Sequence, residues 1–251
     1  MLVIHINKVN KSFGNELILQ SVSCHIERYT PTVILGPSGA GKSTLLRCIN
    51  GLVEIDGGQV TVDNVALSRH PRKLREFRKS IGMIFQQFNL IQRISVLENV
   101  LCGRLAYTST FQSLLTKFTN ADYELACQYL DKVGLYEKRF QKAGQLSGGQ
   151  QQRISIARAL VQRPKVLLAD EPVASLDPKT SQVVLDLLTK ISEEEKISLV
   201  LTLHSVELAL QYSKKIIGLN QGKIIAQYDT DKTNAAEIGS VYDQLEEVAN
   251  L

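Results

Sequence analysis

The sequence predicts an α/β fold in which a mostly parallel sheet is flanked by helices, with an N-terminal antiparallel β subdomain and an inserted α-helical subdomain. Three observations indicate this. Short buried-type runs of the kind found in parallel strands occur at 33–35, 166–169 and 197–203, the first before a glycine-rich segment and the other two before polar residues. Apolar and polar residues alternate within 2–28, and helical periodicity replaces strand-type runs from about 88 to 161.

One domain is therefore expected over 1–251. Segments 1–87 and 162–251 form the α/β core with its β subdomain, and 88–161 form the helical subdomain. Within 88–161 we expect three helices, the middle one over 107–120. A strand pair turning at Gln221–Gly222 and a polar helix complete the chain.

Composition excludes several classes of protein. The chain has 251 residues, of which 44% are hydrophobic and 22% charged, and no apolar run approaches the roughly 18 residues that a membrane-spanning helix needs. The first six residues read as a strand rather than a signal peptide, so we expect a soluble, cytoplasmic protein. The four cysteines have no metal-type spacing and are expected to be small buried hydrophobes. A basic segment at 69–79 lacks interleaved aromatics, which favours a solvated helix face over a nucleic-acid site.

The segment Gly36-Pro37-Ser38-Gly39-Ala40-Gly41-Lys42-Ser43-Thr44 lies between an apolar run and a helix-type pattern. Glycines let successive backbone N–H groups turn toward a polyphosphate, and the following helix offers its positive end to the same anion. Lys42 adds a charge for the outer phosphates, and the Ser43 hydroxyl is suited to ligate Mg²⁺. A glycine-rich turn without a ligand is the alternative, but the complete spacing in this context predicts nucleoside triphosphate binding.

A second glycine turn, Leu146-Ser147-Gly148-Gly149-Gln150, opens another helix. Ser147 is a good N-cap, and the two glycines allow an anion to approach the backbone closely. One active site needs two such anion-binding turns only if they face the same phosphates from opposite sides.

Polar residues follow three of the expected strands. Asp170 and Glu171 end the run 166–169, and we interpret them as the metal-side carboxylate and the general base. Gln86 follows a strand expected to lie beside the phosphate-loop strand, where its amide could reach Mg²⁺ or a water. An exposed loop glutamine is the alternative. His204 ends the run 197–203, where it could contact a γ-phosphate, although a structural histidine is the alternative.

Two further positions complete the set of candidate residues. Phe13, beside an expected turn at Gly14–Asn15, could stack on a base or serve as a packing residue. Asp177 lies in a turn that enters a helix at about 179–194.

The order GPSGAGKST, Gln86, LSGGQQQR, VLLADE, ASLD and His204 resembles the nucleotide-binding subunit of an ATP-binding cassette (ABC) transporter over essentially the whole chain. The resemblance implies ATP and Mg²⁺ as ligands. It places Phe13 on adenine, Gly36 to Thr44 around the phosphates, and Gln86 at a loop that senses Mg²⁺ and the membrane partner. It gives Asp170 the role of metal-side carboxylate and Glu171 that of general base. It gives Asp177 a place in the loop at the dimer interface and His204 the role of a switch residue. Ser147, Gly148, Gly149 and Gln150 belong to the turn that would contact the γ-phosphate bound on a second copy in a head-to-tail dimer.

Finer features are similar to the ATPases of phosphonate and phosphite importers: the segments 81–91, 95–105 and 108–110, and the run VASLDP at 173–178. Ser205 stands where that subgroup more usually has glutamine. The resemblance implies membrane-spanning permease subunits and an extracytoplasmic solute-binding protein as partners, no nucleic acid, and a peripheral location on the cytoplasmic face of the membrane.

Three alternatives stay open from the sequence. The same ATPase could power the import of another small solute, such as a polar amino acid or methionine. A non-transport ABC ATPase is a second possibility, although such proteins tend to carry two cassettes or a long coiled-coil insertion. A P-loop kinase is the third, and it is opposed by the second glycine turn and by Glu171, which suits activation of water.

Overall fold

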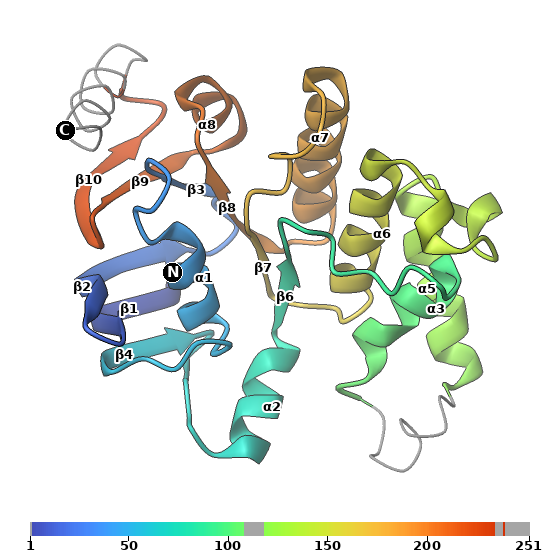
Figure 1. Ribbon diagram of the computed structural model, residues 1–251, viewed down its shortest axis with the longest axis horizontal. Helices are drawn as coiled ribbons and strands as arrows, with labels where there is room; N and C mark the ends of the chain where they lie inside the picture. Colours follow the sequence, from blue (N-terminus) through green and yellow to red (C-terminus); the bar gives the residue numbers. More distant parts are fainter. Residues whose placement is uncertain (1, 108–117, 234–237, 239–251) are drawn as a thin grey trace.

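A computed structural model describes residues 2–107, 118–233 and 238 of the chain. Its larger sheet has six strands in the order β10-β9-β3-β8-β7-β6, and all adjacent pairs are parallel except β9 with β10 (Figure 1). The strands are β3 (Thr32–Leu35), β6 (Ile81–Ile84), β7 (Val166–Ala169), β8 (Ser198–Leu203), β9 (Lys215–Asn220) and β10 (Lys223–Asp229). Strands β3, β6, β7 and β8 are buried throughout, which explains their continuous rather than alternating patterns. The predicted α/β fold with a mostly parallel sheet is confirmed.

A second, antiparallel sheet has the order β2-β1-β4-β5. Its strands are β1 (Leu2–Phe13), β2 (Glu16–Glu27), β4 (Gly57–Val62) and β5 (Val65–Ala66). The predicted ribbon and its turn at Gly14–Asn15 are present. β4 begins at the glycine pair Gly57–Gly58. A Cβ at Gly58 would lie 2.3 Å from the carbonyl oxygen of Lys8, so glycine permits a close strand approach at this irregular pairing.

The helices match the periodic segments where the structure describes them. They are α1 (Lys42–Ile49), α2 (Pro71–Lys79), α3 (Val96–Leu101), α5 (Asn120–Lys132), α6 (Gly148–Leu160), α7 (Pro178–Glu194) and α8 (Val206–Tyr212), with short 3₁₀ turns η1 (Cys102–Arg104), η2 (Tyr136–Lys138) and η3 (Ala143–Gln145). Ser95, Thr119 and Ser147 each form a capping box, which fixes where α3, α5 and α6 begin. The predicted helix over 107–120 falls largely on 108–117, and the predicted terminal helix on 234–251 (apart from 238), outside the described residues. The boundaries 88 and 161 of the helical subdomain stay a prediction.

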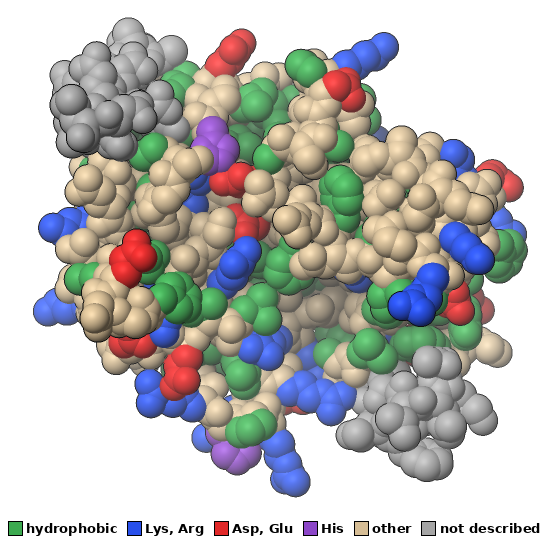
Figure 2. Space-filling view, in the orientation of Figure 1, with side chains coloured by type: hydrophobic (Ala, Val, Ile, Leu, Met, Phe, Trp, Pro, Cys, Tyr) green, Lys and Arg blue, Asp and Glu red, His purple; other side chains and the backbone are tan. Residues whose placement is uncertain are grey.

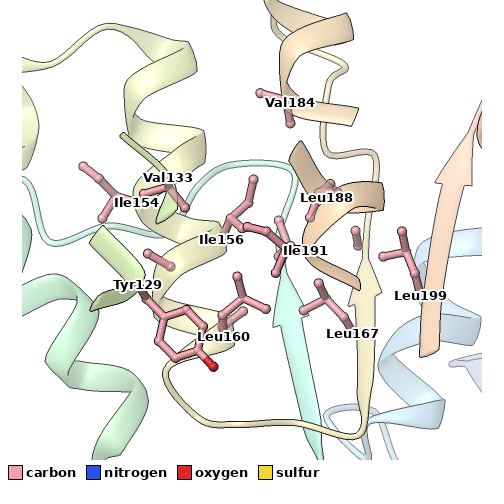
Figure 3. Close-up of a cluster of buried hydrophobic side chains, with 14 of the residues drawn as sticks. Tyr129, Val133, Ile154, Ile156, Leu160, Leu167, Val184, Leu188, Ile191 and Leu199 are labelled. Carbon is pink, nitrogen blue, oxygen red and sulfur yellow. The ribbon is translucent and has the colours of Figure 1, made fainter. Parts of the chain in front are cut away.

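Two apolar clusters cover opposite faces of the six-stranded sheet. Val33 and Leu35 belong to one cluster and Ile34 to the other, because successive strand residues point to opposite faces. Helices α3, α5, α6 and α7 pack on the first face, and α1 with the second sheet packs on the other. Side chains of α6 and α7 meet over β7 and β8 (Figure 3). Burying each such Leu or Ile side chain contributes about 1.5–3 kcal/mol, so this packing fixes the sheet that carries the site.

The strand order corrects one expectation. The strand before Gln86, β6, was predicted to lie beside β3, but β8 and β7 separate them. The chain leaves β3 on one side of these two positions and returns as β6 on the other, and β7 and β8 fill the gap later. Parallel strands with equally apolar sequences carry no local signal of their order in the sheet.

Candidate active site

The loop between β3 and α1 depends on three glycines. Gly39 and Gly41 have φ angles of 79° and 101°, which strain other residues, and Gly41 is the N-cap of α1. A Cβ at Gly36 would lie 2.1 Å from the Leu219 carbonyl oxygen of β9. The loop is therefore wedged against its neighbour strand and turns its backbone toward the N-terminal end of α1, as a phosphate site requires.

Lys42 is buried at the centre of the site. Its ammonium donates to the carbonyl oxygens of Gly36 at 2.7 Å and Pro37 at 3.0 Å and lies 3.3 Å from His204 Nδ1. Burial lowers the pKa of Lys42, and the carboxylates of Glu171 and Asp170 oppose that shift. An ammonium removed from water in this way gains from an anionic ligand in its place.

Glu171 and His204 form a second contact beside Lys42. Glu171 Oε1 lies 2.6 Å from His204 Nε2 and 3.7 Å from Lys42 Nζ. Because an ammonium only donates, His204 Nδ1 accepts from Lys42, which places the ring proton on Nε2 and directs it to Glu171. The carboxylate of Glu171 is therefore held by the ring of His204.

Asp170 lies under the loop, fully buried at the end of β7. Its Oδ1 accepts from the Ser43 hydroxyl at 2.7 Å and the Thr202 hydroxyl at 3.2 Å. Its Oδ2 is buried, has no hydrogen-bond partner in the part of the chain that the structure describes, and lies 3.6 Å from an Arg47 guanidinium nitrogen. A hydroxyl and a carboxylate with a spare buried oxygen are oxygen donors of the kind Mg²⁺ prefers. The residues present thus fit a magnesium ion, although the described residues hold no cluster of three or more His, Cys, Asp or Glu.

The structure brings Lys42, Ser43, Asp170, Glu171 and His204 together, as expected from strand ends that share one edge of a parallel sheet. Gln86 lies exposed in the turn after β6 and is not among the residues that contact Asp170 in the described part of the chain. Phe13 is 52% exposed, and whether it stacks on a base or serves as a packing residue stays a prediction. The Lys11 ammonium lies 5.2 Å from its ring centroid.

The turn at Ser147–Gln150 lies apart from the phosphate loop, at the start of α6. The Ser147 hydroxyl accepts from the Gln150 amide, and Ser147 and Gly148 are exposed. In Figure 1, α6 and α1 lie in opposite halves of the view, with β7 and β8 between them. The first glycines of α6 instead contact the segment after Glu171: a Cβ at Gly148 would lie 3.5 Å from Leu176, and one at Gly149 would lie 2.4 Å from Thr180.

Asp177 caps α7 next to this contact. Its carboxylate accepts from the Thr180 amide at 3.0 Å, and this interaction lowers the pKa of Asp177. The segment between Glu171 and α7 therefore ends at a capped helix whose first turn lies against Gly149 of α6.

Sequence reasoning missed two residues at the site. Thr202 contacts both Asp170 and the backbone of Glu171, and its signal is a hydroxyl near the end of an apolar strand. Arg158 of α6 donates to the carbonyl oxygens of Phe88 and Asn89, two residues with positive φ in the loop after Gln86. Nothing local in the sequence marks Arg158, because its partners lie some 70 positions earlier in the chain.

A family profile described as ABC transporter matches residues 19–174, more than half of the chain. The chain belongs to the ABC transporter family. It is 43% identical over 244 residues to "Phosphonates import ATP-binding protein PhnC 2" of Oceanobacillus iheyensis, covering 96% of both chains. It is 46% identical over 236 residues to "Phosphonates import ATP-binding protein PhnC 1" of Halalkalibacterium halodurans, covering 92% of both.

Solved ABC cassettes share the fold. The ADP conformation of the cassette MJ1267 matches with a TM-score of 0.84 at 28% identity, covering 99% of this chain and 98% of that one. A dimeric structure of the bacterial ABC transporter cassette MJ0796 matches with a TM-score of 0.79 at 34% identity, covering 90% and 98%. Among the described residues of this ABC family member, no helix is both long and apolar enough to cross a membrane.

Proposed function

We propose that this chain is the ATP-hydrolysing subunit of an importer that takes up a phosphonate, phosphite or related phosphorus oxyanion. The observation that carries the hydrolysis is the contact chain from Lys42 through His204 to Glu171, beside the Ser43–Asp170 pair. The names of relatives at 43–46% identity over more than nine-tenths of the chain support the cargo.

The phosphate loop, Glu171 and His204 each have a defined task in the proposed reaction. The loop 36–44 and Lys42 bind the β- and γ-phosphates, whose oxygens replace the backbone carbonyls as acceptors of the ammonium. Glu171 accepts the proton of the attacking water, and His204, whose Nε2–H holds that carboxylate, orients it and contacts the γ-phosphate.

The metal side is formed by Ser43, Asp170 and Gln86. Mg²⁺ bound there would neutralise charge on the phosphate oxygens and orient them for attack. Ser43 and Asp170 are already paired at 2.7 Å, so the hydroxyl and the carboxylate need no long movement to serve one ion. Gln86 would join them from its exposed turn after β6.

Two copies acting head to tail account for the two anion-binding turns. In this arrangement Ser147, Gly148 and Gly149 of one copy close on the triphosphate held by the other, and Asp177 lies at the junction. The exposure of Ser147 and Gly148 supports this proposal, as does the dimeric form of a related cassette. Phe13, exposed at the tip of the β1–β2 hairpin, is then free to stack on the adenine base.

A groove beside the Gln86 loop is the surface we assign to the membrane-spanning subunits, on the cytoplasmic face of the membrane. This groove, of about 220 Å³, lies along the edge strand β6. Its lining includes Leu52, Ile81, Met83, Phe85, Cys102 and Arg158. Leu52 is 45% exposed, and nearby Lys and Arg side chains gather over α2 (Figure 2). Arg158 lines the groove and donates hydrogen bonds to the backbone carbonyls of Phe88 and Asn89. Binding of a permease segment in the groove would therefore act on the loop that follows Gln86.

The test uses the complex reconstituted with its permease and solute-binding protein in liposomes. We expect ATP hydrolysis to rise when a phosphonate or phosphite loads the binding protein. Glu171→Gln should retain ATP binding, lose nearly all hydrolysis and accumulate as an ATP-bound dimer in size-exclusion chromatography. Stimulation by an amino acid but not by any phosphorus oxyanion would refute the cargo. Wild-type hydrolysis in the Glu171→Gln complex would refute the assignment of the base.

A further inference from the structure

Thr202 places a hydroxyl inside the apolar strand β8. Its side chain is wholly buried between β3 and β7, opposite Ile34 of β3 and next to Asp170, which follows Ala169 at the end of β7. The hydroxyl accepts from the Glu171 backbone N–H at 2.8 Å and donates to Asp170 Oδ1 at 3.2 Å. These directions are fixed, because an amide N–H only donates and a carboxylate only accepts.

The first consequence concerns the carboxylate of Asp170. Thr202 and Ser43 both donate to the same oxygen, Oδ1, and leave Oδ2 buried without a hydrogen-bond partner among the described residues, 3.6 Å from an Arg47 guanidinium nitrogen. An unpaired buried oxygen is unfavourable unless a water, an ion or a charged group satisfies it. The hydroxyl of Thr202 therefore selects which oxygen of Asp170 remains for the metal side.

The second consequence concerns the backbone of Glu171. This residue has a φ of 45°, a left-handed conformation that a non-glycine residue adopts at a cost. The Thr202 hydroxyl takes its amide hydrogen, while its carboxylate lies 2.6 Å from His204 Nε2. Because such strain persists only where the surroundings hold it, Thr202 is one of the contacts that aim the Glu171 side chain.

We propose that Thr202 is a positioning residue for hydrolysis, which fixes both the free oxygen of Asp170 and the strained backbone of Glu171 through one hydroxyl. The proposal rests on the ATPase function above. It means that β8 positions Asp170 and Glu171 through Thr202, in addition to placing His204 at its end.

The test compares three substitutions at this position with one matched control. Thr202→Val keeps the shape and removes the hydroxyl, Thr202→Ala removes it in a smaller side chain, and Thr202→Ser retains it. Thr32→Val is the control, since Thr32 is also fully buried, pairs with Val200 of β8, and has a hydroxyl that donates to the Thr30 carbonyl oxygen.

Two measurements are made on the full chain. ATP hydrolysis is titrated with Mg²⁺, and Mn²⁺ binding to the ATP-loaded Glu171→Gln chain is followed by electron paramagnetic resonance with and without each substitution. We expect Thr202→Val and Thr202→Ala to lose about 10–100-fold in hydrolysis rate or metal affinity, as removal of an outer contact to a ligand does. Thr202→Ser and Thr32→Val should stay near wild type, and ATP affinity in EDTA should stay unchanged in all four.

The proposal is overturned if Thr202→Val binds Mn²⁺ and hydrolyses ATP as the wild type does. It is equally overturned if Thr202→Ser is as impaired as Thr202→Val, because packing would then be the cause. A wild-type chain that binds Mn²⁺ with ATP but never hydrolyses it would refute the ATPase function, while the resonance spectra would still decide the role of Thr202.

Discussion

Gly149 gives a quantitative test of how the start of α6 packs on α7. A Cβ at this position would lie 2.4 Å from Thr180 Cγ2, but 3.8 Å and 4.0 Å from its Cβ and Oγ1. Gly149→Ala therefore overpacks against a single methyl group, which costs about 1–3 kcal/mol of the free energy of unfolding. The better helix propensity of alanine offsets up to about 1 kcal/mol of that.

Thr180→Ser removes the opposing methyl and keeps the hydroxyl and the backbone amide that Asp177 caps. In the double variant the closest remaining Thr180 atoms are at van der Waals distance, so alanine should be accommodated. We expect a coupling free energy of about 1–3 kcal/mol between the two substitutions, in the direction of rescue.

The assay is urea denaturation of the wild type, both single variants and the double variant. Gly148→Ala is the matched control, because its Cβ would lie 3.5 Å from Leu176 and should leave stability unchanged or slightly raised. Additive effects within about 0.5 kcal/mol would show that Gly149 and Thr180 do not meet as described, and would refute the reasoning.

Three further predictions follow from the site, the groove and an ion-paired turn. Lys42→Ala removes the buried ammonium and should weaken ATP binding about 10–100-fold, since a hydrogen bond to a charged group contributes about 1.5–3 kcal/mol; unchanged affinity by calorimetry would contradict this. Leu52→Glu, at a half-exposed position of the groove, should abolish co-purification with the permease and leave ATP affinity unchanged; retained assembly would move the docking surface elsewhere. Hydrogen bonds from Lys165 and Arg28 lower the pKa of Asp63, so its contribution to stability is present above about pH 4 and is lost as pH falls through the lowered pKa. Asp63→Asn should therefore lose less of its free energy of unfolding than the wild type between pH 6 and pH 3 in urea titrations, and equal losses would exclude Asp63 as the cause.

Local chemistry explains what could be predicted from the sequence. The phosphate loop could be predicted because Gly39 and Gly41 are themselves the residues that adopt positive φ angles. The meeting of Asp170, Glu171 and His204 with Lys42 is also predictable, since the carboxyl ends of parallel strands share one edge whatever their order.

The order of the strands in the larger sheet could not be predicted from the sequence. β6, β7 and β8 are short and buried throughout, so their sequences do not say which strand pairs with β3. The partners of Thr202 and Arg158 are distant in the chain and follow from that order. The exposure of Phe13 was undecided because a ring beside a turn suits either environment.

The position of β3 has a consequence for how the protein is made. Its two neighbours in the sheet, β8 and β9, are translated long after it. The phosphate loop also depends on the β9–β10 turn, where the Gly222 amide donates a hydrogen bond to the Ala40 carbonyl oxygen. About 180 residues separate Leu35 from Lys215, which a ribosome adds in roughly 10–40 seconds. Strands β1, β2 and β4 can pair as they emerge, but the phosphate loop completes its sheet contacts only after β9 has been synthesised. A chain terminated before β9 would therefore carry the complete GPSGAGKST sequence without the strand against which Gly36 packs.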